Sequence, residues 1–277
     1  MGQSDPSVTA LINALDDKPT HKWSETDIRD MGFDPSTVRR MFKRAFGVTF
    51  LDMARQRRLA QGFTTLQSGN VIAAQLDAGF DSPSAFRSTF SKLMGMAPGH
   101  LKPNALLRAD HISTPIGSMI AVCDKSALHL LEFADRKALP TELQRLRKLT
   151  KDNIGIGQFE TTNQVRGELD AYFAGTSDQF KTPLVMHGTA FTRKVWQALR
   201  NIPAGQTRSY SQLAAQIDAS NATRAVARAN GANQIALMIP CHRVLGADGS
   251  LTGYGGGLWR KQRLIDLEKH YAQRKTA

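Results

Sequence analysis

The stretch VIAAQLDAGFDSPSAFRSTFSKLMG, residues 71–95, has the order of a short helix, a turn and a second helix. Its apolar residues recur at three- and four-residue spacing, which is typical of amphipathic helices. Gly79 supplies the turn, and Asp81, Ser82 and Pro83 are residue types that begin a helix. The stretch therefore predicts a helix-turn-helix unit.

The second helix of this unit is expected to have an apolar and a polar face. The apolar face carries Phe86, Phe90 and Leu93, and the polar face carries Ser84, Arg87 and Ser88. A helix of this kind can lie in the major groove of DNA when the first helix holds it rigidly. We take the three polar residues as candidate DNA contacts.

The same design occurs earlier, in ETDIRDMGFDPSTVRRMFKRAFG at residues 25–47. Its second helix carries Arg39, Arg40 and Lys43, which are further candidate DNA contacts. Either segment alone is more simply interpreted as an amphipathic helix with a solvated basic face. The two together favour DNA binding.

Composition and charge agree with a nucleic-acid partner. The 277 residues are 41% hydrophobic and 22% charged, a globular balance, and the formal net charge is +12. Basic residues outnumber acidic ones 13 to 10 in residues 1–105 and 13 to 4 in residues 191–277. Nucleic acid is the first partner that such an excess indicates, with a membrane surface as the weaker alternative.

Nothing in the sequence predicts a membrane span or a secretory signal. The longest apolar runs, such as IALMIP at residues 235–240, are too short to cross a bilayer, and residues 1–10 have no basic-then-apolar pattern. We therefore expect a cytoplasmic protein with Cys123 and Cys241 as free thiols.

The pattern changes twice along the chain, which predicts three domains. Residues 5–103 read as helices, residues 108–187 as short strands followed by two helices, and residues 188–271 as helices that lead into a cysteine segment. The expected boundaries lie near residues 105 and 188.

The cysteine segment is IPCHRV, residues 239–244, and it raises the question of what Cys241 does. An ordinary thiol has a pKa of about 8.5, so a nucleophile needs an adjacent base or a helix start to ionise it. Pro240 should turn the chain and present the thiol, and His242 is the obvious base, directly or through water. We expect a third group to orient the imidazole.

Three other interpretations of Cys241 compete with a DNA-directed nucleophile. A zinc site would need more ligands at a recognisable spacing, and no metal is expected. A cysteine hydrolase would not explain the basic surroundings. A buried structural thiol is the default interpretation of a lone cysteine until the flanking motifs are considered.

The flanking motifs favour the nucleophile. Upstream, residues 210–217 and 222–229 predict two short helices, and the second carries Arg224 and Arg228 among small residues such as Ala225 that allow close approach to a groove. Downstream, GYGGG at residues 253–257 predicts a flexible loop that can offer backbone N–H groups.

Two resemblances follow from these residues. GF, a short polar stretch, F-x-x-x-F-x-x-x-x-G and a proline in residues 79–98 resemble the signature of the AraC-type transcriptional regulators, over roughly residues 5–103. PCHRV, with RAV upstream and LTGYGGGL downstream, resembles the O6-alkylguanine-DNA alkyltransferases, over roughly residues 108–271. Together they resemble the Ada family of bifunctional proteins, without that family's N-terminal cysteine-rich zinc module.

The resemblance implies a multidomain α+β fold: a double helix-turn-helix, a small RNase H-like α/β domain and a winged-helix-like catalytic domain. It implies that Cys241 accepts the alkyl group, His242 acts as base through water and Glu268 orients the histidine. The further residues and roles that it implies are Tyr210 for proton transfer to the guanine ring, Arg224 as the finger that replaces the extruded base, Asn233 as the brace of the preceding turn, and Tyr254 and Gly255 as the loop over the guanine.

The implied function is irreversible DNA repair, with one turnover and no cofactor, because the methyl group ends as a thioether. The implied partners are duplex DNA carrying O6-methylguanine or O4-methylthymine, promoter DNA and RNA polymerase. Two alternatives stay open at this point: a transcriptional regulator with a vestigial or sensory alkyltransferase domain, and a lesion-binding protein that does no chemistry.

Overall fold

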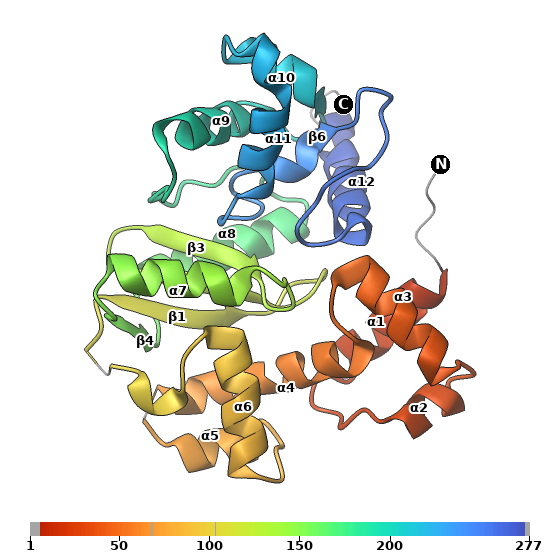
Figure 1. Ribbon diagram of the computed structural model, residues 1–277, viewed down its shortest axis with the longest axis vertical. Helices are drawn as coiled ribbons and strands as arrows, with labels where there is room; N and C mark the ends of the chain where they lie inside the picture. The colour runs from red at the N-terminus through yellow and green to blue at the C-terminus, as the bar shows by residue number, and fades with distance from the viewer. Residues whose placement is uncertain (1–5, 68, 103, 275–277) are drawn as a thin grey trace.

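The computed structural model describes residues 6–67, 69–102 and 104–274. It has three tiers: the N-terminal helices, a central four-stranded sheet, and the C-terminal helices on the opposite side of the sheet from the first tier (Figure 1). This arrangement confirms the mixed α and β, multidomain fold expected from the sequence.

The first tier contains two helix-turn-helix units joined by a long helix. The helices are α1 (Pro6–Asp17), α2 (Glu25–Asp30), α3 (Pro35–Phe46), α4 (Phe50–Leu66), α5 (Val71–Asp77) and α6 (Pro83–Met94). Ser24, Asp34, Asn70 and Ser82 cap α2, α3, α5 and α6, each accepting a hydrogen bond from a backbone N–H in the first turn. Gly47 and Gly95, both left-handed, end α3 and α6.

The second tier is a sheet with a helix on each face. Its strands are β1 (Leu107–Ile112), β2 (Met119–Cys123), β3 (Leu128–Phe133) and β4 (Ile154–Ile156), in the order β3-β2-β1-β4. β2 is antiparallel to both neighbours, and β4 is parallel to β1. Both faces of β2 are buried, with α8 (Glu160–Phe173) on one and α7 (Leu139–Leu149) on the other.

The third tier carries the cysteine segment. Its helices are α9 (Ala190–Arg200), α10 (Tyr210–Gln216), α11 (Thr223–Gly231) and α12 (Leu258–Arg274), with a short parallel pair of β5 (Arg208–Ser209) and β6 (Val244–Leu245). The two short helices predicted upstream of the cysteine are confirmed as α10 and α11.

The tiers share hydrophobic cores instead of each having its own. One core joins α1–α3 and the start of α4 to the α8 face of the sheet and to the third tier. The other joins the second helix-turn-helix unit to the α7 face. The boundaries near residues 105 and 188 thus remain a prediction as domain limits, because packing crosses both.

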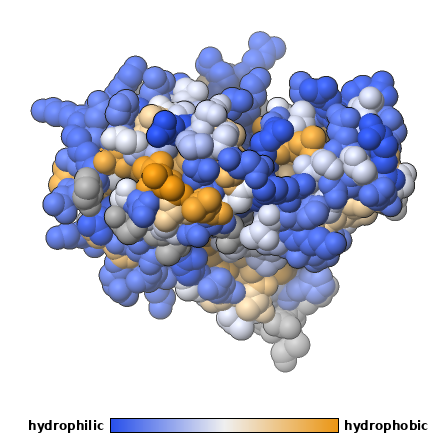
Figure 2. Space-filling model, turned by 90° about the horizontal axis from the view of Figure 1, so that it is seen from below, coloured by the Kyte–Doolittle hydropathy of each residue, from blue (hydrophilic) through white to orange (hydrophobic). Residues whose placement is uncertain are grey.

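The predicted recognition faces point away from these cores. All six polar candidates, Arg39, Arg40, Lys43, Ser84, Arg87 and Ser88, are exposed, whereas Phe86, Phe90 and Leu93 are buried. Seen from below, the surface is mostly hydrophilic and is interrupted by an apolar area (Figure 2). No helix in the described ranges is long and apolar enough to cross a membrane.

Candidate active site

Cys241 lies at the start of a single 3-10 turn, Cys241–Arg243, that leads into β6. The chain reaches it through a tight bend in which Leu237 adopts a left-handed φ of 70° and Pro240 precedes the thiol. A branched residue at positive φ is strained, and strain of this kind is tolerated where the surroundings hold the backbone in place. After this bend, Cys241 is 7% exposed.

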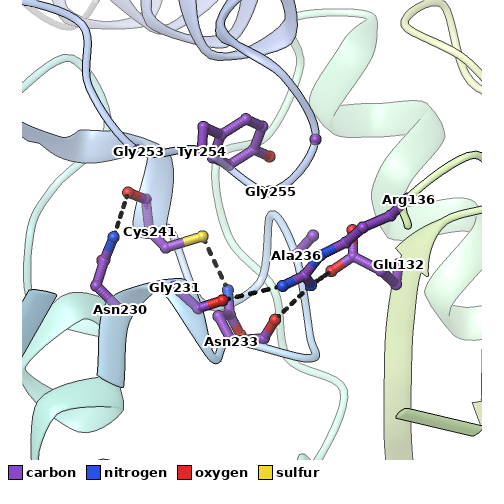
Figure 3. Close-up of a pocket in the computed structure, with 11 residues that line it drawn as sticks. Glu132, Arg136, Asn230, Gly231, Asn233, Ala236, Cys241, Gly253, Tyr254 and Gly255 are labelled. Atoms are coloured by element: carbon purple, nitrogen blue, oxygen red, sulfur yellow. Dashed lines mark hydrogen bonds and ion pairs between the residues drawn. The ribbon is translucent and has the colours of Figure 1, made fainter. Parts of the chain in front are cut away.

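Asn233 braces this bend. Its Nδ2 donates to the carbonyl oxygen of Ile239 at 2.8 Å and to Cys241 Sγ at 3.1 Å. Its Oδ1 accepts from the backbone N–H of Ile235 at 2.9 Å. One amide therefore fixes both the bend and the sulfur atom (Figure 3).

Behind the thiol, His242 and Glu268 form the expected pair. His242 Nε2 lies 2.9 Å from Glu268 Oε1, and both side chains are almost completely buried. Glu268 also accepts from Arg243 Nε at 2.9 Å and from the Tyr172 hydroxyl at 2.8 Å. The carboxylate thus determines the imidazole orientation and leaves Nδ1 as the atom that can take a proton.

His242 Nδ1 is buried and has no hydrogen-bond partner within the described residues. No direct hydrogen bond joins the imidazole to Cys241 there, because side chains of adjacent residues tend to point apart. A proton that passes from the sulfur to the histidine therefore needs a bridging molecule.

The charges of this pair are set by burial and by mutual contact. Burial lowers the pKa of His242, with Glu268 opposing the shift, so the imidazole is neutral at neutral pH. Burial opposes ionisation of Glu268, but His242 and Arg243 outweigh it and hold the pKa of that carboxyl well below its usual range. The result is a neutral base held by a permanent anion.

The thiol itself differs from the sequence-based expectation. Burial raises the pKa of Cys241 to about 11, and the hydrogen bond from Asn233 only partly opposes the shift. In the DNA-free form, neither the adjacent base nor the helix start offsets the effect of burial on the thiol. The physical reason is desolvation, since three residues of 3-10 helix give little dipole and His242 is neutral.

A small pocket opens next to the sulfur. It is lined by Glu132, Arg136, Asn230, Gly231, Asn233, Ala236, Cys241 and the 253–256 loop. The loop lies above the thiol and places the Tyr254 ring over it (Figure 3). The phenol hydroxyl of Tyr254 is buried without a partner in the described chain.

Arg136 connects the pocket to the central sheet. It forms an ion pair with Glu132 and donates to the carbonyl oxygens of Asn233 at 2.7 Å and Gly231 at 2.9 Å. A Cβ on Gly255 would lie 2.6 Å from Arg136 Nε, so the loop requires glycine where it crosses the guanidinium. Arg136, which follows β3, thus connects the sheet to two sides of the pocket: the 231–233 segment and the 253–256 loop.

Not every expected residue lines the pocket. Tyr210 lies beside it, with its hydroxyl 3.2 Å from where a Cβ of Gly253 would be, at the N-terminus of α10. Burial raises the pKa of this phenol, which keeps it protonated. Arg224 and Arg228 are exposed on α11 and Ala225 is half-buried, so the helix presents a basic face to solvent.

Several residues of the site were not anticipated, among them Tyr172, Asn230, Glu132, Arg136, Arg243 and Lys261. Lys261 is fully buried and donates to the carbonyl oxygens of Val244 and Thr252, and burial lowers its pKa to about 8. In the sequence these residues look like ordinary members of helices and strands. Of these residues, only Asn230 could have been suspected from the sequence, because it lies three residues before Asn233.

Within the described ranges, no group of three or more His, Cys, Asp or Glu side chains is placed to hold a metal ion. The reactive groups at the pocket are the thiol, the histidine–glutamate pair and the loop. A soft nucleophile, a neutral base and a pocket beside the sulfur with an amide donor fit transfer of an alkyl group to sulfur.

Two family models match the chain. The 6-O-methylguanine DNA methyltransferase, DNA binding domain, matches residues 190–270, and a helix-turn-helix domain matches residues 28–103. The first of these ranges contains Cys241, His242 and Glu268, and the second contains the polar face of α3 and α6.

Curated relatives match more than half of the chain. The methylated-DNA–protein-cysteine methyltransferase of Mycobacterium leprae is 43% identical over 165 residues, which cover 60% of this chain and 94% of the relative. The protein of the same name from Salmonella typhimurium is 40% identical over 169 residues, covering 58% and 95%.

Solved structures of O6-methylguanine methyltransferases also match this chain. The O6-methylguanine methyltransferase of Mycobacterium tuberculosis is 39% identical and superposes with a TM-score of 0.52, covering 60% of this chain and 94% of that one. A Mycobacterium tuberculosis OGT structure in complex with DNA gives a TM-score of 0.51 at 39% identity, covering 60% and 93%.

Proposed function

Because this chain belongs to the family of methylated-DNA–protein-cysteine methyltransferases, we propose that it repairs DNA by moving the methyl group of O6-methylguanine to Cys241. The observation that carries the proposal is the sulfur held by Asn233 at the base of a pocket, next to the buried His242–Glu268 pair. O4-methylthymine is a second candidate substrate. We propose that the protein acts in the cytoplasm.

His242 acts as the base that ionises the thiol. Its Nε2–H is committed to Glu268, so the free lone pair is on Nδ1, and a bridging water carries the thiol proton there. Glu268 stabilises the imidazolium that forms. Because the pKa of Cys241 is about 11 in the free protein, the thiolate forms only once the substrate is in place.

Methyl transfer then forms one bond and breaks one. The sulfur attacks the methyl carbon, the C–O6 bond breaks, and its electron pair stays on the guanine. Tyr210, whose phenol is protonated, donates a proton toward the ring, and the backbone N–H groups near Tyr254 and Gly255 stabilise the charge that develops on O6. The thioether cannot be hydrolysed by this site, so each molecule acts once.

α11 delivers the base to the pocket. Its exposed arginines suit contacts with the DNA backbone, and its small residues allow close approach to a groove. Turning a base out of the stack costs a few kcal/mol, which Arg224 offsets by filling the gap.

The experiment compares the two cysteines of the chain. Incubation with duplex DNA carrying a labelled methyl group should label wild type and Cys123→Ala equally, because Cys123 is buried in β2 and lies outside the pocket. Cys241→Ala should accept no label and still bind lesion DNA with similar affinity. Equal loss of binding and transfer in Cys241→Ala would mean that the thiol is structural.

Transcriptional control is the second activity, supported by two helix-turn-helix units with exposed polar faces. We propose promoter DNA as the partner of α3 and α6. An activator must also contact RNA polymerase, and Ile72 and Leu76, which are 70% and 67% exposed on α5, offer a surface for that contact.

Footprinting tests this second activity. A preferred site should be protected at moderate salt, and protection should be lost in Arg87→Ala while methyl transfer persists. Uniform, strongly salt-dependent binding to all sequences would contradict sequence-specific control.

A further inference from the structure

Tyr172, in α8 of the second tier, reaches the histidine–glutamate pair of the third tier. Its side chain is 1% exposed, and its hydroxyl donates to Glu268 Oε1 at 2.8 Å. Its ring stacks on that of Tyr271 in α12, with the centroids 5.8 Å apart, and the Tyr271 hydroxyl donates to the Tyr172 carbonyl oxygen. The steps of methyl transfer described above do not involve the buried Tyr172 hydroxyl.

This hydroxyl binds the same oxygen atom that orients the imidazole. Glu268 Oε1 lies 2.9 Å from His242 Nε2 and also accepts from Arg243 Nη2 at 2.7 Å. A hydrogen bond donated to a carboxylate stabilises its negative charge. Each further donor on Oε1 therefore weakens the attraction of that oxygen for a positively charged imidazole.

Glu268 is the group that favours a charged imidazole at this site. The other titratable or charged groups near the pair are Cys241 and Arg243 of the cysteine segment, Lys261 of α12, Tyr254 of the pocket loop and Tyr172 of α8. Burial lowers the pKa of His242 most, and the positive charges of Arg243 and Lys261 lower it further, whereas Glu268 raises it. A donor that draws charge from Glu268 therefore acts in the same direction as burial.

The Tyr172 hydroxyl acts only as a donor. Burial and the neighbouring Glu268 raise the pKa of this phenol well above its ordinary value, so it keeps its proton. When the thiol proton passes through water to His242 Nδ1, the tyrosine neither gives up nor receives a proton. Its effect on the reaction is electrostatic and is exerted through Oε1.

We propose that Tyr172 is a positioning residue that acts through Glu268 and keeps the His242 imidazole neutral, so that the imidazole can take the thiol proton. The proposal rests on the proposed function, since it concerns the base of the same reaction. Loss of the hydroxyl would leave more negative charge on Oε1 and favour the imidazolium, so the pKa of His242 would rise. The second tier thus adjusts the base of the site in the third tier.

The test measures single-turnover methyl transfer to Cys241 at saturating lesion DNA from about pH 4.5 to 8, the range in which an imidazole titrates. Tyr172→Phe removes the hydroxyl and keeps the ring. Tyr271→Phe is the matched control, because it removes the hydroxyl of the stacked neighbour, which donates to the carbonyl oxygens of Tyr172 and Ser177. An NMR titration of the His242 imidazole in each protein reads the same equilibrium without DNA.

Transfer should be lost toward acid pH as His242 becomes protonated, and the midpoint of this loss should lie about 0.5–1 pH unit higher in Tyr172→Phe than in wild type. At a pH within this range, transfer should be about three- to tenfold slower, while rates at higher pH stay within about twofold. Tyr271→Phe should keep the wild-type midpoint, and both variants should bind lesion DNA with wild-type affinity.

A second variant reverses the sign of the change. 3-Fluorotyrosine at position 172 has a more acidic hydroxyl, which is a stronger donor, and almost the same shape. The midpoint should therefore move to lower pH than in wild type, both in transfer and in the NMR titration. This variant carries the test alone if Tyr172→Phe does not fold.

An equal midpoint in wild type and Tyr172→Phe, or a change that Tyr271→Phe reproduces, would overturn the proposal. A rate that falls equally at every pH would do the same, because it would assign the hydroxyl a purely structural role. Labelling of Cys241 in wild type at higher pH sustains the proposed function whatever the midpoints are, so the two failures are distinguishable.

Discussion

At the scale of single residues, the site keeps the Cys241 thiol neutral and the His242 imidazole unprotonated, so that the imidazole can accept a proton. The pKa of Cys241 is raised to about 11 by burial, while that of His242 is lowered by burial. A neutral thiol resists oxidation and stray alkylation better than a thiolate. Because the protein is used once, this protection preserves it for a substrate that completes the pocket.

Glu268 should be the residue whose replacement costs most stability. It is 1% exposed and pairs with His242, Arg243 and Tyr172, so Glu268→Gln leaves a buried arginine without its anion. We expect the free energy of unfolding at pH 7 to fall by about 3–5 kcal/mol. Urea unfolding measures it, with the exposed Glu160→Gln as the matched control that should change little.

The pH dependence of this difference follows from the sign of the pKa shift. The folded pKa of Glu268 is lowered, so its contribution is complete above the usual glutamate pKa of about 4.3 and is lost as the pH falls toward the folded value. The gap between wild type and Glu268→Gln should therefore narrow below about pH 4. A gap that stays constant there would contradict the assignment.

The residues that the sequence predicted and those that it missed differ in a physical way. Cys241 and His242 could be predicted because they are adjacent in the sequence, and Glu268 could be predicted because its position matches a family pattern. Tyr172 and Arg136 act through contacts with residues that are 96 and 97 positions away. Such contacts depend on how the sheet packs against the third tier, which no local spacing records.

At the scale of elements, helix and turn chemistry was well predicted. Gly79 and the stretch Asp81, Ser82 and Pro83 correctly placed the turn and the start of α6, because these signals act within a few residues. The pocket loop was predicted as flexible, yet the structure packs it closely. A Cβ on Gly256 would lie 2.8 Å from the Phe133 ring, and one on Gly257, which has a φ of 90°, would lie 3.0 Å from the Ala45 carbonyl oxygen.

The two arginines of α11 should behave differently. Arg224→Ala removes the side chain that we expect to fill the gap left by the base, so single-turnover transfer should slow by about ten- to a hundredfold, equivalent to roughly 1.4–2.8 kcal/mol. Arg228→Ala should weaken binding to damaged and undamaged DNA alike and reduce the salt slope by about one. Equal effects of both changes on transfer would contradict an insertion role for Arg224.

At the scale of the whole molecule, the helix-turn-helix units and the repair site form one packed body. The ring of Phe46, at the end of α3, lies 6.5 Å from the ring of Trp259, measured between centroids. The guanidinium of Arg260 lies over the Phe46 ring, 5.8 Å from its centroid. Arg260 also pairs with Asp135 and donates to the Gly256 carbonyl oxygen. The pocket loop and Arg260 therefore contact the first helix-turn-helix unit directly. A change in the conformation of the loop would reach that unit through these contacts.

The sequence predicted three tiers but gave no sign of this packing, because interfaces between domains depend on surfaces that are far apart along the chain. Phe46 and Trp259, for example, are 213 positions apart in the sequence. The structure places both in or against one core.

Unfolding in guanidinium should therefore be cooperative across the tiers. Trp23 packs on Phe50 in the first tier and Trp196 is buried in the third, so single-tryptophan variants can report on each separately. We expect the two transitions to coincide. A first-tier transition at clearly lower denaturant would show that the helix-turn-helix units fold independently.

The most direct test of the central claim is mass spectrometry of the protein after reaction with excess duplex that carries O6-methylguanine. The account requires one added methyl group per chain, found on the peptide that contains Cys241, with no further uptake when fresh DNA is added. A methyl group on any other residue, or continued turnover with an unmodified Cys241, would contradict it.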